Sequence, residues 1–157
     1  MKSVLSVDVA NGKSVVLLIT EHGEVLIEPY EVKHCLSDFN SLKNKIDTFF
    51  VFGGTNDAWA RSPIGEYQYA DWTKEDCKSF RPALACLLDT LQKRYPKAEI
   101  YSILNSELRE EINESFREVC KHYNVQLIEL HDIEKQNGHP SVSGMKSICD
   151  QLLEAIK

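Results

Sequence analysis

From about residue 48 onward, the sequence alternates short apolar runs with longer segments whose apolar residues recur at helical spacing. The apolar runs are predicted strands: TFFVF (48–52), AEIYSIL (98–104) and VQLIEL (125–130). Strands that are separated by helices pair in parallel, with right-handed crossovers. The sequence therefore predicts an α/β fold with a mainly parallel sheet flanked by helices.

Capping residues predict where the helices begin. The expected starts are Thr73, in a Thr73–Asp76 capping box, then Ser106, and finally Ser141 or Ser143. The first of these helices contains Pro82, which should kink or divide it near Phe80, because proline has no N–H to donate. The second is expected to run to about Tyr123.

Residues 3–30 follow a different pattern. Three apolar runs are separated by the turn Asn11-Gly12 and by a glycine-containing loop at residues 21–23, which predicts consecutive antiparallel strands. A short helix is expected over residues 38–46. Since nothing near residue 47 resembles a flexible linker, we expect a single domain over 1–157. Its β-rich segment 1–46 would then share one sheet with segment 47–157.

The composition excludes several classes of protein. The 157 residues suffice for one domain with a core, and the net charge of −6 without a basic run makes nucleic-acid binding unlikely. No apolar stretch approaches a membrane span, and the early Asp8 argues against a signal peptide. The five cysteines contain no C-x-x-C pair, so we expect a reducing, cytoplasmic location. Four are expected in the core: Cys77, Cys86, Cys120 and Cys149.

The first candidate for a functional site is Gly53-Gly54-Thr55-Asn56-Asp57, which directly follows the strand TFFVF. Sites in parallel sheets lie at the carboxyl ends of the strands. Glycine allows backbone N–H groups to approach a ligand, and the neutral amide of Asn56 can donate to a developing oxyanion. The same residue types are also common in ordinary turns.

The second candidate is NGHPSVSGM, residues 137–145, where His139 precedes a predicted helix. Pro140 restricts the backbone of His139 to an extended conformation, so the imidazole could be presented to a cleft as a general base. The alternative is a loop histidine that only packs or caps.

Together, FVFGGTND and GHPSVSGM resemble the third and fifth blocks of the SGNH/GDSL hydrolase family, over residues 48–157. The resemblance implies an incomplete flavodoxin-like fold and hydrolysis of acyl or acetyl esters through a serine acyl-enzyme. Asn56 and the backbone of Gly54 would bind the oxyanion, and His139 would be the base. A small-molecule ester is the implied substrate, and no cofactor or metal is implied.

The sequence departs from the family pattern at two places. The family has an aspartate three residues before the histidine, but this chain has Gln136 there, with Asp132 and Glu134 nearby in sequence as possible substitutes. The chain also contains no G-D-S block, so the nucleophile is not identified. Loss of a triad nucleophile normally costs several orders of magnitude in rate.

A long loop is expected after the first motif, with Trp59, Tyr67, Tyr69 and Trp72 as either a substrate wall or packing residues. Arg61 could bind a substrate carboxylate or hydroxyl, or be a solvated loop residue.

Residues 3–46 resemble the start of insertion-sequence transposases with a RuvC-like DEDD nuclease domain, in which Asp8 would match the first metal-binding acid. Three hypotheses follow: an ester hydrolase, impaired by the missing block; an inactive module that binds a small molecule or carbohydrate; and a metal-dependent nuclease-like fragment. A serine hydroxyl near His139 would favour the first, and further acids around Asp8 the third.

Overall fold

The computed structural model describes residues 3–10, 13–20, 25–33 and 46–156, with side chains from residue 46 onward. A six-stranded sheet has the order β3-β2-β1-β4-β5-β6. Its strands are β1 (Ser3–Ala10), β2 (Lys13–Thr20), β3 (Val25–Lys33), β4 (Thr48–Gly53), β5 (Glu99–Leu104) and β6 (Gln126–Glu129). The expected helix at residues 38–46 lies almost entirely outside the described residues.

Both predicted strand patterns are present in this one sheet. Strands β1, β2 and β3 pair antiparallel, as expected for consecutive hairpins. Strand β1 also pairs in parallel with β4, and β4–β5 and β5–β6 are parallel. Asp8 stands opposite Phe52 in this register, so the carboxyl ends of β1 and β4 lie at the same edge. The α/β fold with a mainly parallel sheet from residue 48 onward is confirmed.

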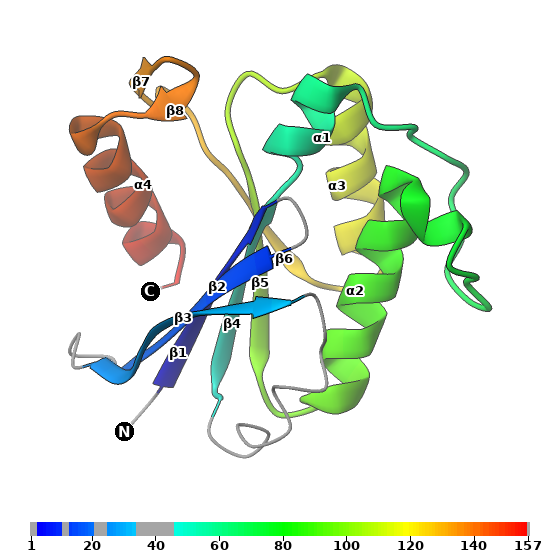
Figure 1. Cartoon of the computed structure of the whole chain (residues 1–157), viewed down its shortest axis with the longest axis horizontal. Helices are drawn as coiled ribbons and strands as arrows, with labels where there is room; N and C mark the ends of the chain where they lie inside the picture. Colours follow the sequence, from blue (N-terminus) through cyan, green and yellow to red (C-terminus); the bar gives the residue numbers. More distant parts are fainter. Residues whose placement is uncertain (1–2, 11–12, 21–24, 34–45, 157) are drawn as a thin grey trace.

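Helices cover both faces of the sheet (Figure 1), with α2 and α3 on one side and α4 on the other. The helices are α1 (Thr55–Ala60), α2 (Phe80–Arg94), α3 (Glu110–His122) and α4 (Val142–Ala155), with a 3-10 helix, η2 (Asp76–Lys78), before α2. A separate two-stranded sheet joins β7 (Lys135–Gln136) to β8 (His139–Pro140). No described helix is both long enough and apolar enough to cross a membrane.

Two apolar clusters hold these layers together, because successive side chains of a strand point to opposite faces. One face of β5 contributes Ile100 and Leu104 to a cluster with α2 and α3, centred on Leu88 and Phe116. The other face contributes Ile103 to a cluster that includes residues of β6 and α4.

The starts of two helices differ from the predictions. Thr73 and Asp76 form the expected reciprocal bonds, at 2.8 and 3.2 Å, but these precede only the 3-10 helix. The α-helix begins at Phe80, which confirms the division expected there. Pro82 lies in the first turn of this helix, where it is tolerated because the N–H groups of a first turn have no intrahelical partners. The helix expected from Ser106 begins instead at Glu110, because Glu107 adopts a left-handed φ of 62°, which a continuous helix excludes.

The cysteines only partly follow the prediction that four of them are core residues. Cys120 is buried, and burial raises the pKa of its thiol to about 11. Cys77 and Cys86 are half-buried, whereas Cys149 is exposed on α4, so its assignment to the core was wrong. Residue 149 follows the buried Ile148, and neighbouring helical positions point in different directions.

Gly54 makes the close approach that turns the chain from β4 into α1. Its φ is +82°, and a Cβ there would lie 2.8 Å from Cε2 of Phe116 and 3.3 Å from Cγ2 of Ile112. A side chain at this position would therefore strain the backbone and push α1 away from α3.

We expect Gly54→Ala to lower the free energy of unfolding by roughly 2–5 kcal/mol, from the left-handed backbone and from overpacking. Gly53→Ala is the matched control, because no described atom lies within 4 Å of a Cβ there. It should change the stability by less than about 1 kcal/mol. Urea unfolding measures both, and equal losses in the two variants would contradict this account.

Candidate active site

Polar side chains that follow β4 and β5 meet at the carboxyl edge of the sheet. Nδ2 of Asn105, directly after β5, donates to Oγ1 of Thr55, the first residue of α1, at 3.0 Å. Asn105 is buried, and its Oδ1 has no partner among the described residues. The bond ties α1 to the end of β5. Asn105 was not among the predicted site residues, although a polar residue directly after the run AEIYSIL obeys the strand-end rule used for the first motif.

Asn56 is the second residue of α1 and is exposed to solvent. The predicted turn is therefore the start of a short helix, in which the carbonyl of Gly54 accepts from the N–H of Ala58 at 2.9 Å. Asn56 and Trp59 are three residues apart, so they lie on the same side of α1. Gly54 itself is buried beneath this turn, and its role in binding an oxyanion stays a prediction.

His139 lies in a tight hairpin. It pairs with Gln136 across β7 and β8, and the two intervening residues, Asn137 and Gly138, have φ values of 52° and 80°. Positive φ at both central residues is the requirement of a type I′ turn, and Asn-Gly is its commonest sequence. This hairpin signal was used at residues 11–12 but missed here. His139 is consequently an exposed residue of β8 rather than part of an irregular loop.

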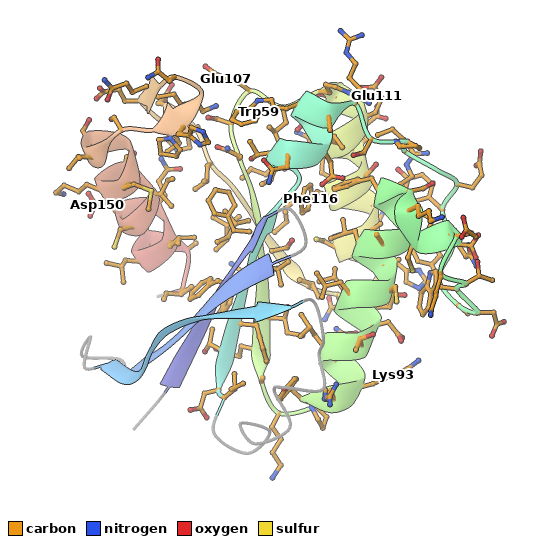
Figure 2. The ribbon with its side chains drawn as sticks, viewed as in Figure 1. Trp59, Lys93, Glu107, Glu111, Phe116 and Asp150 are labelled. Atoms are coloured by element: carbon orange, nitrogen blue, oxygen red, sulfur yellow. The ribbon has the colours of Figure 1, made fainter. Side chains whose placement is uncertain are left out.

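Trp59, labelled in Figure 2, links the two sequence motifs. Its ring and that of His139 have centroids 5.2 Å apart and planes at 82° to each other. A Cβ on Gly138 would lie 2.9 Å from Cζ2 of Trp59, so the indole also packs closely on the turn. Asn56 and His139 thus lie at one edge of the molecule, next to the same tryptophan.

The acid and amide candidates near His139 occupy different positions. Gln136 is directly opposite His139, where Cβ atoms are typically about 5 Å apart. No hydrogen bond joins their side chains among the described contacts. The carboxylate of Asp132 instead contacts Nδ1 of His131 at 3.1 Å, and that of Glu134 accepts from the hydroxyl of Ser143. The structure therefore gives both acids partners other than His139.

Arg61 and the aromatic residues of the predicted loop lie at different places in the structure. Arg61 is exposed and caps α1 in a left-handed conformation, five positions after Asn56. Trp59 belongs to α1 and not to the predicted loop. Tyr69 stacks on His122 of α3, with centroids 3.6 Å apart, and the guanidinium of Arg81 lies 4.0 Å from the ring centroid of Tyr67. These loop aromatics pack against α2 and α3, away from the hairpin.

No described serine or threonine hydroxyl is hydrogen-bonded to His139. The described side chains also contain no group of three or more histidine, cysteine or acidic residues able to hold a metal ion. The side chain of Asp8 lies outside the described part of the chain, so the acids expected around it are not tested. This edge therefore presents two exposed groups, the amide of Asn56 and the imidazole of His139, beside the indole of Trp59.

A lysine side chain and a backbone hydrogen bond anchor the hairpin that carries His139. Nζ of Lys135 donates to the carbonyl of Ser106 at 2.7 Å and to Glu107 at 3.0 Å, which ties β7 to the loop after β5. On the other strand, the N–H of Ser141 donates to the carbonyl of Glu134 at 2.9 Å. Oγ of Ser141 accepts from the N–H of Gly144 at 3.1 Å and begins α4, as predicted.

Lys135→Met should lower the free energy of unfolding by about 1–3 kcal/mol, because it removes a charged donor from a carbonyl and a carboxylate. The Lys135 side chain is only 17% exposed, so water replaces these bonds poorly. Lys146→Met removes an exposed pair with Asp150 and should cost less than about 0.5 kcal/mol. Thermal or urea unfolding compares them, and an unchanged stability of Lys135→Met would refute the anchoring role.

Comparison with known proteins places this geometry in a family. The family model described as GDSL-like lipase/acylhydrolase matches residues 28–156. The match therefore begins within β3, before the boundary expected near residue 47. A search of curated proteins found no match. These similarities lend no support to the transposase resemblance of residues 3–46, which stays a prediction.

Solved structures agree with the family match. A GDSL-like lipase from Bacteroides ovatus ATCC 8483 is 52% identical, with a TM-score of 0.70 over 75% of this chain and 58% of its own. One from Bacteroides uniformis ATCC 8492 is also 52% identical, with a TM-score of 0.69 over 79% of this chain and 61% of its own. A Lactobacillus plantarum protein at 20% identity shares the fold, with a TM-score of 0.63 over 79% of this chain and 72% of its own. The chain spans about three fifths of the length of the two Bacteroides proteins. The chain belongs to the GDSL-like lipase/acylhydrolase family.

Proposed function

We propose that the protein hydrolyses acyl or acetyl esters of small molecules, with His139 as general base and the Asn56 amide as an oxyanion donor. The observation that carries this proposal is the position of Trp59. It shares one side of α1 with Asn56 and contacts the ring of His139. A donor and a base that face one reacting carbonyl are the minimum that ester hydrolysis needs.

The two groups have complementary roles in the reaction. The imidazole removes a proton from the attacking hydroxyl or water as the new C–O bond forms, and the carbonyl oxygen gains negative charge. The NH2 group of Asn56 donates to that oxygen. The imidazolium then returns the proton to the departing alcohol as the ester bond breaks. Asn56 and His139 are exposed, so a small ester can reach both.

The absence of a G-D-S block from the sequence determines the expected rate. With a serine, the reaction would pass through an acyl-enzyme. Without one, the same base can act on water, and the oxyanion donor and substrate binding supply the remaining catalysis. Triads that lack one member keep roughly 10³–10⁴-fold acceleration over water. We therefore infer an esterase of reduced activity. We also propose that it acts in the cytoplasm, because the cysteine pattern favours a reducing compartment.

The test is hydrolysis of 4-nitrophenyl acetate by the purified protein and by His139→Ala and Asn56→Ala. Each substitution should lower kcat/KM at least about tenfold, because each removes a group that acts in the transition state. His131→Ala is the control, since this exposed histidine contacts Asp132 and lies outside the proposed site. Its activity should equal that of the unaltered protein.

Labelling with a fluorophosphonate separates the two routes: a covalent adduct indicates a serine nucleophile, and activity without an adduct indicates water. Either result supports the hydrolase. A folded protein without turnover, or one whose turnover ignores both substitutions, contradicts it. Binding of the ester without turnover would instead indicate the inactive binding module.

A further inference from the structure

We propose that Trp59 is a positioning residue, whose indole fixes the imidazole of His139 where the family pattern has an aspartate and this chain has Gln136. This proposal rests on the proposed function of His139 as the base. Trp59 would hold the imidazole of His139 while the acids near this histidine are engaged in other contacts.

An acid at the family position would stand directly across the hairpin from His139. The family spacing, acid-x-x-histidine, corresponds here to the two paired positions of the hairpin, Gln136 and His139. Side chains at paired positions share a face of the hairpin, so an acid at residue 136 would reach the imidazole directly. Glutamine carries no charge, and no hydrogen bond from it to the ring is present among the described contacts.

The acids that lie near His139 in the sequence are engaged in other contacts. The carboxylate of Asp132 contacts the ring of its neighbour His131, at 3.1 Å. Glu134 accepts from Ser143 at the start of α4. In the described part of the chain, the aromatic ring that contacts His139 is the indole of Trp59.

The rings of Trp59 and His139 are in close contact. The centroid distance of 5.2 Å and the angle of 82° are those of an edge-to-face aromatic pair. The indole also lies against Gly138, where a Cβ would be 2.9 Å away. Trp59 therefore packs on both the turn and the ring that the turn carries, and this restricts rotation of the imidazole.

Trp59 is itself held in place through α1. It belongs to α1, whose first residue, Thr55, accepts a hydrogen bond from the buried Asn105. The helix is entered through Gly54, which has no room for a side chain against Phe116. The indole is thus attached to the core, although 52% of its surface is exposed.

An aromatic contact orients an imidazole without occupying either ring nitrogen. A carboxylate would use one nitrogen and would also stabilise the imidazolium. Trp59 can replace the orienting role alone. Its loss should therefore lower kcat while KM changes little, and a carboxylate at residue 136 should compensate for that loss.

The ring contact is tested by NMR of the His139 ring protons, which does not require catalytic activity. The indole ring current should displace these signals from their positions in a free histidine. Trp59→Leu should abolish the displacement, and Trp59→Phe should keep part of it. Trp72→Phe is the matched control, because Trp72 packs with α2 and α3 and donates to Gln68. Unchanged His139 signals in a folded Trp59→Leu variant would overturn the proposal, whether or not the protein hydrolyses esters.

The consequence for catalysis is tested by steady-state kinetics on 4-nitrophenyl acetate. Trp59→Leu should lower kcat about 10–100-fold, the loss expected when a catalytic group is misplaced, with KM within about twofold. Trp59→Phe should keep most of kcat, and Trp59→Leu combined with Gln136→Asp should recover at least part of it. A rise in KM at constant kcat would overturn the proposal, because it would make Trp59 a substrate wall. If the unaltered protein shows no turnover, the proposed function fails while the NMR result still decides whether Trp59 holds the ring.

Discussion

The contact between Gly54 and Phe116 sets the position of α1, the helix that directly follows β4. Because residue 54 has no side chain, β4 can end directly against α3, and α1 begins in the next residue. The hydrogen bond from Asn105 to Thr55 fixes the same turn from the neighbouring strand. These two contacts direct Asn56 and Trp59 toward one edge, so the polar end of the sheet depends on an apolar contact beneath it.

The second half of the site is built differently. His139 lies in a hairpin with two residues on each strand. A hairpin this short has little core of its own. Its position comes from connections to three neighbours: the loop after β5 through Lys135, the start of α4 through Glu134 and Ser141, and α1 through Trp59. In the proposed arrangement, packing against Trp59 holds the ring of His139, and Gln136 stands at the position across the hairpin.

The parts of the fold that were predicted correctly are those where pattern and turn chemistry agree. The strand–helix alternation from residue 48 and the antiparallel N-terminal strands both gave the right elements. Predictions failed where a local signal was overruled or overlooked. The capping box at Thr73 forms but does not start α2, and Ser106 fails to start α3 because the chain passes through a left-handed Glu107. The Asn137-Gly138 turn was visible in the sequence, whereas the contact of Trp59 with His139 is a tertiary feature that no spacing encodes.

The central claim is that Asn56 and His139 act on one reacting carbonyl. A double-mutant cycle on ester hydrolysis tests it most directly, with Asn56→Ala, His139→Ala and the double variant compared with the unaltered protein. Residues that act on one reacting centre are energetically coupled, typically by about 0.5–3 kcal/mol. The account predicts that the loss of kcat/KM in the double variant differs from the product of the two single losses by more than about twofold. Losses that multiply within error would show two independent effects and would contradict a shared site.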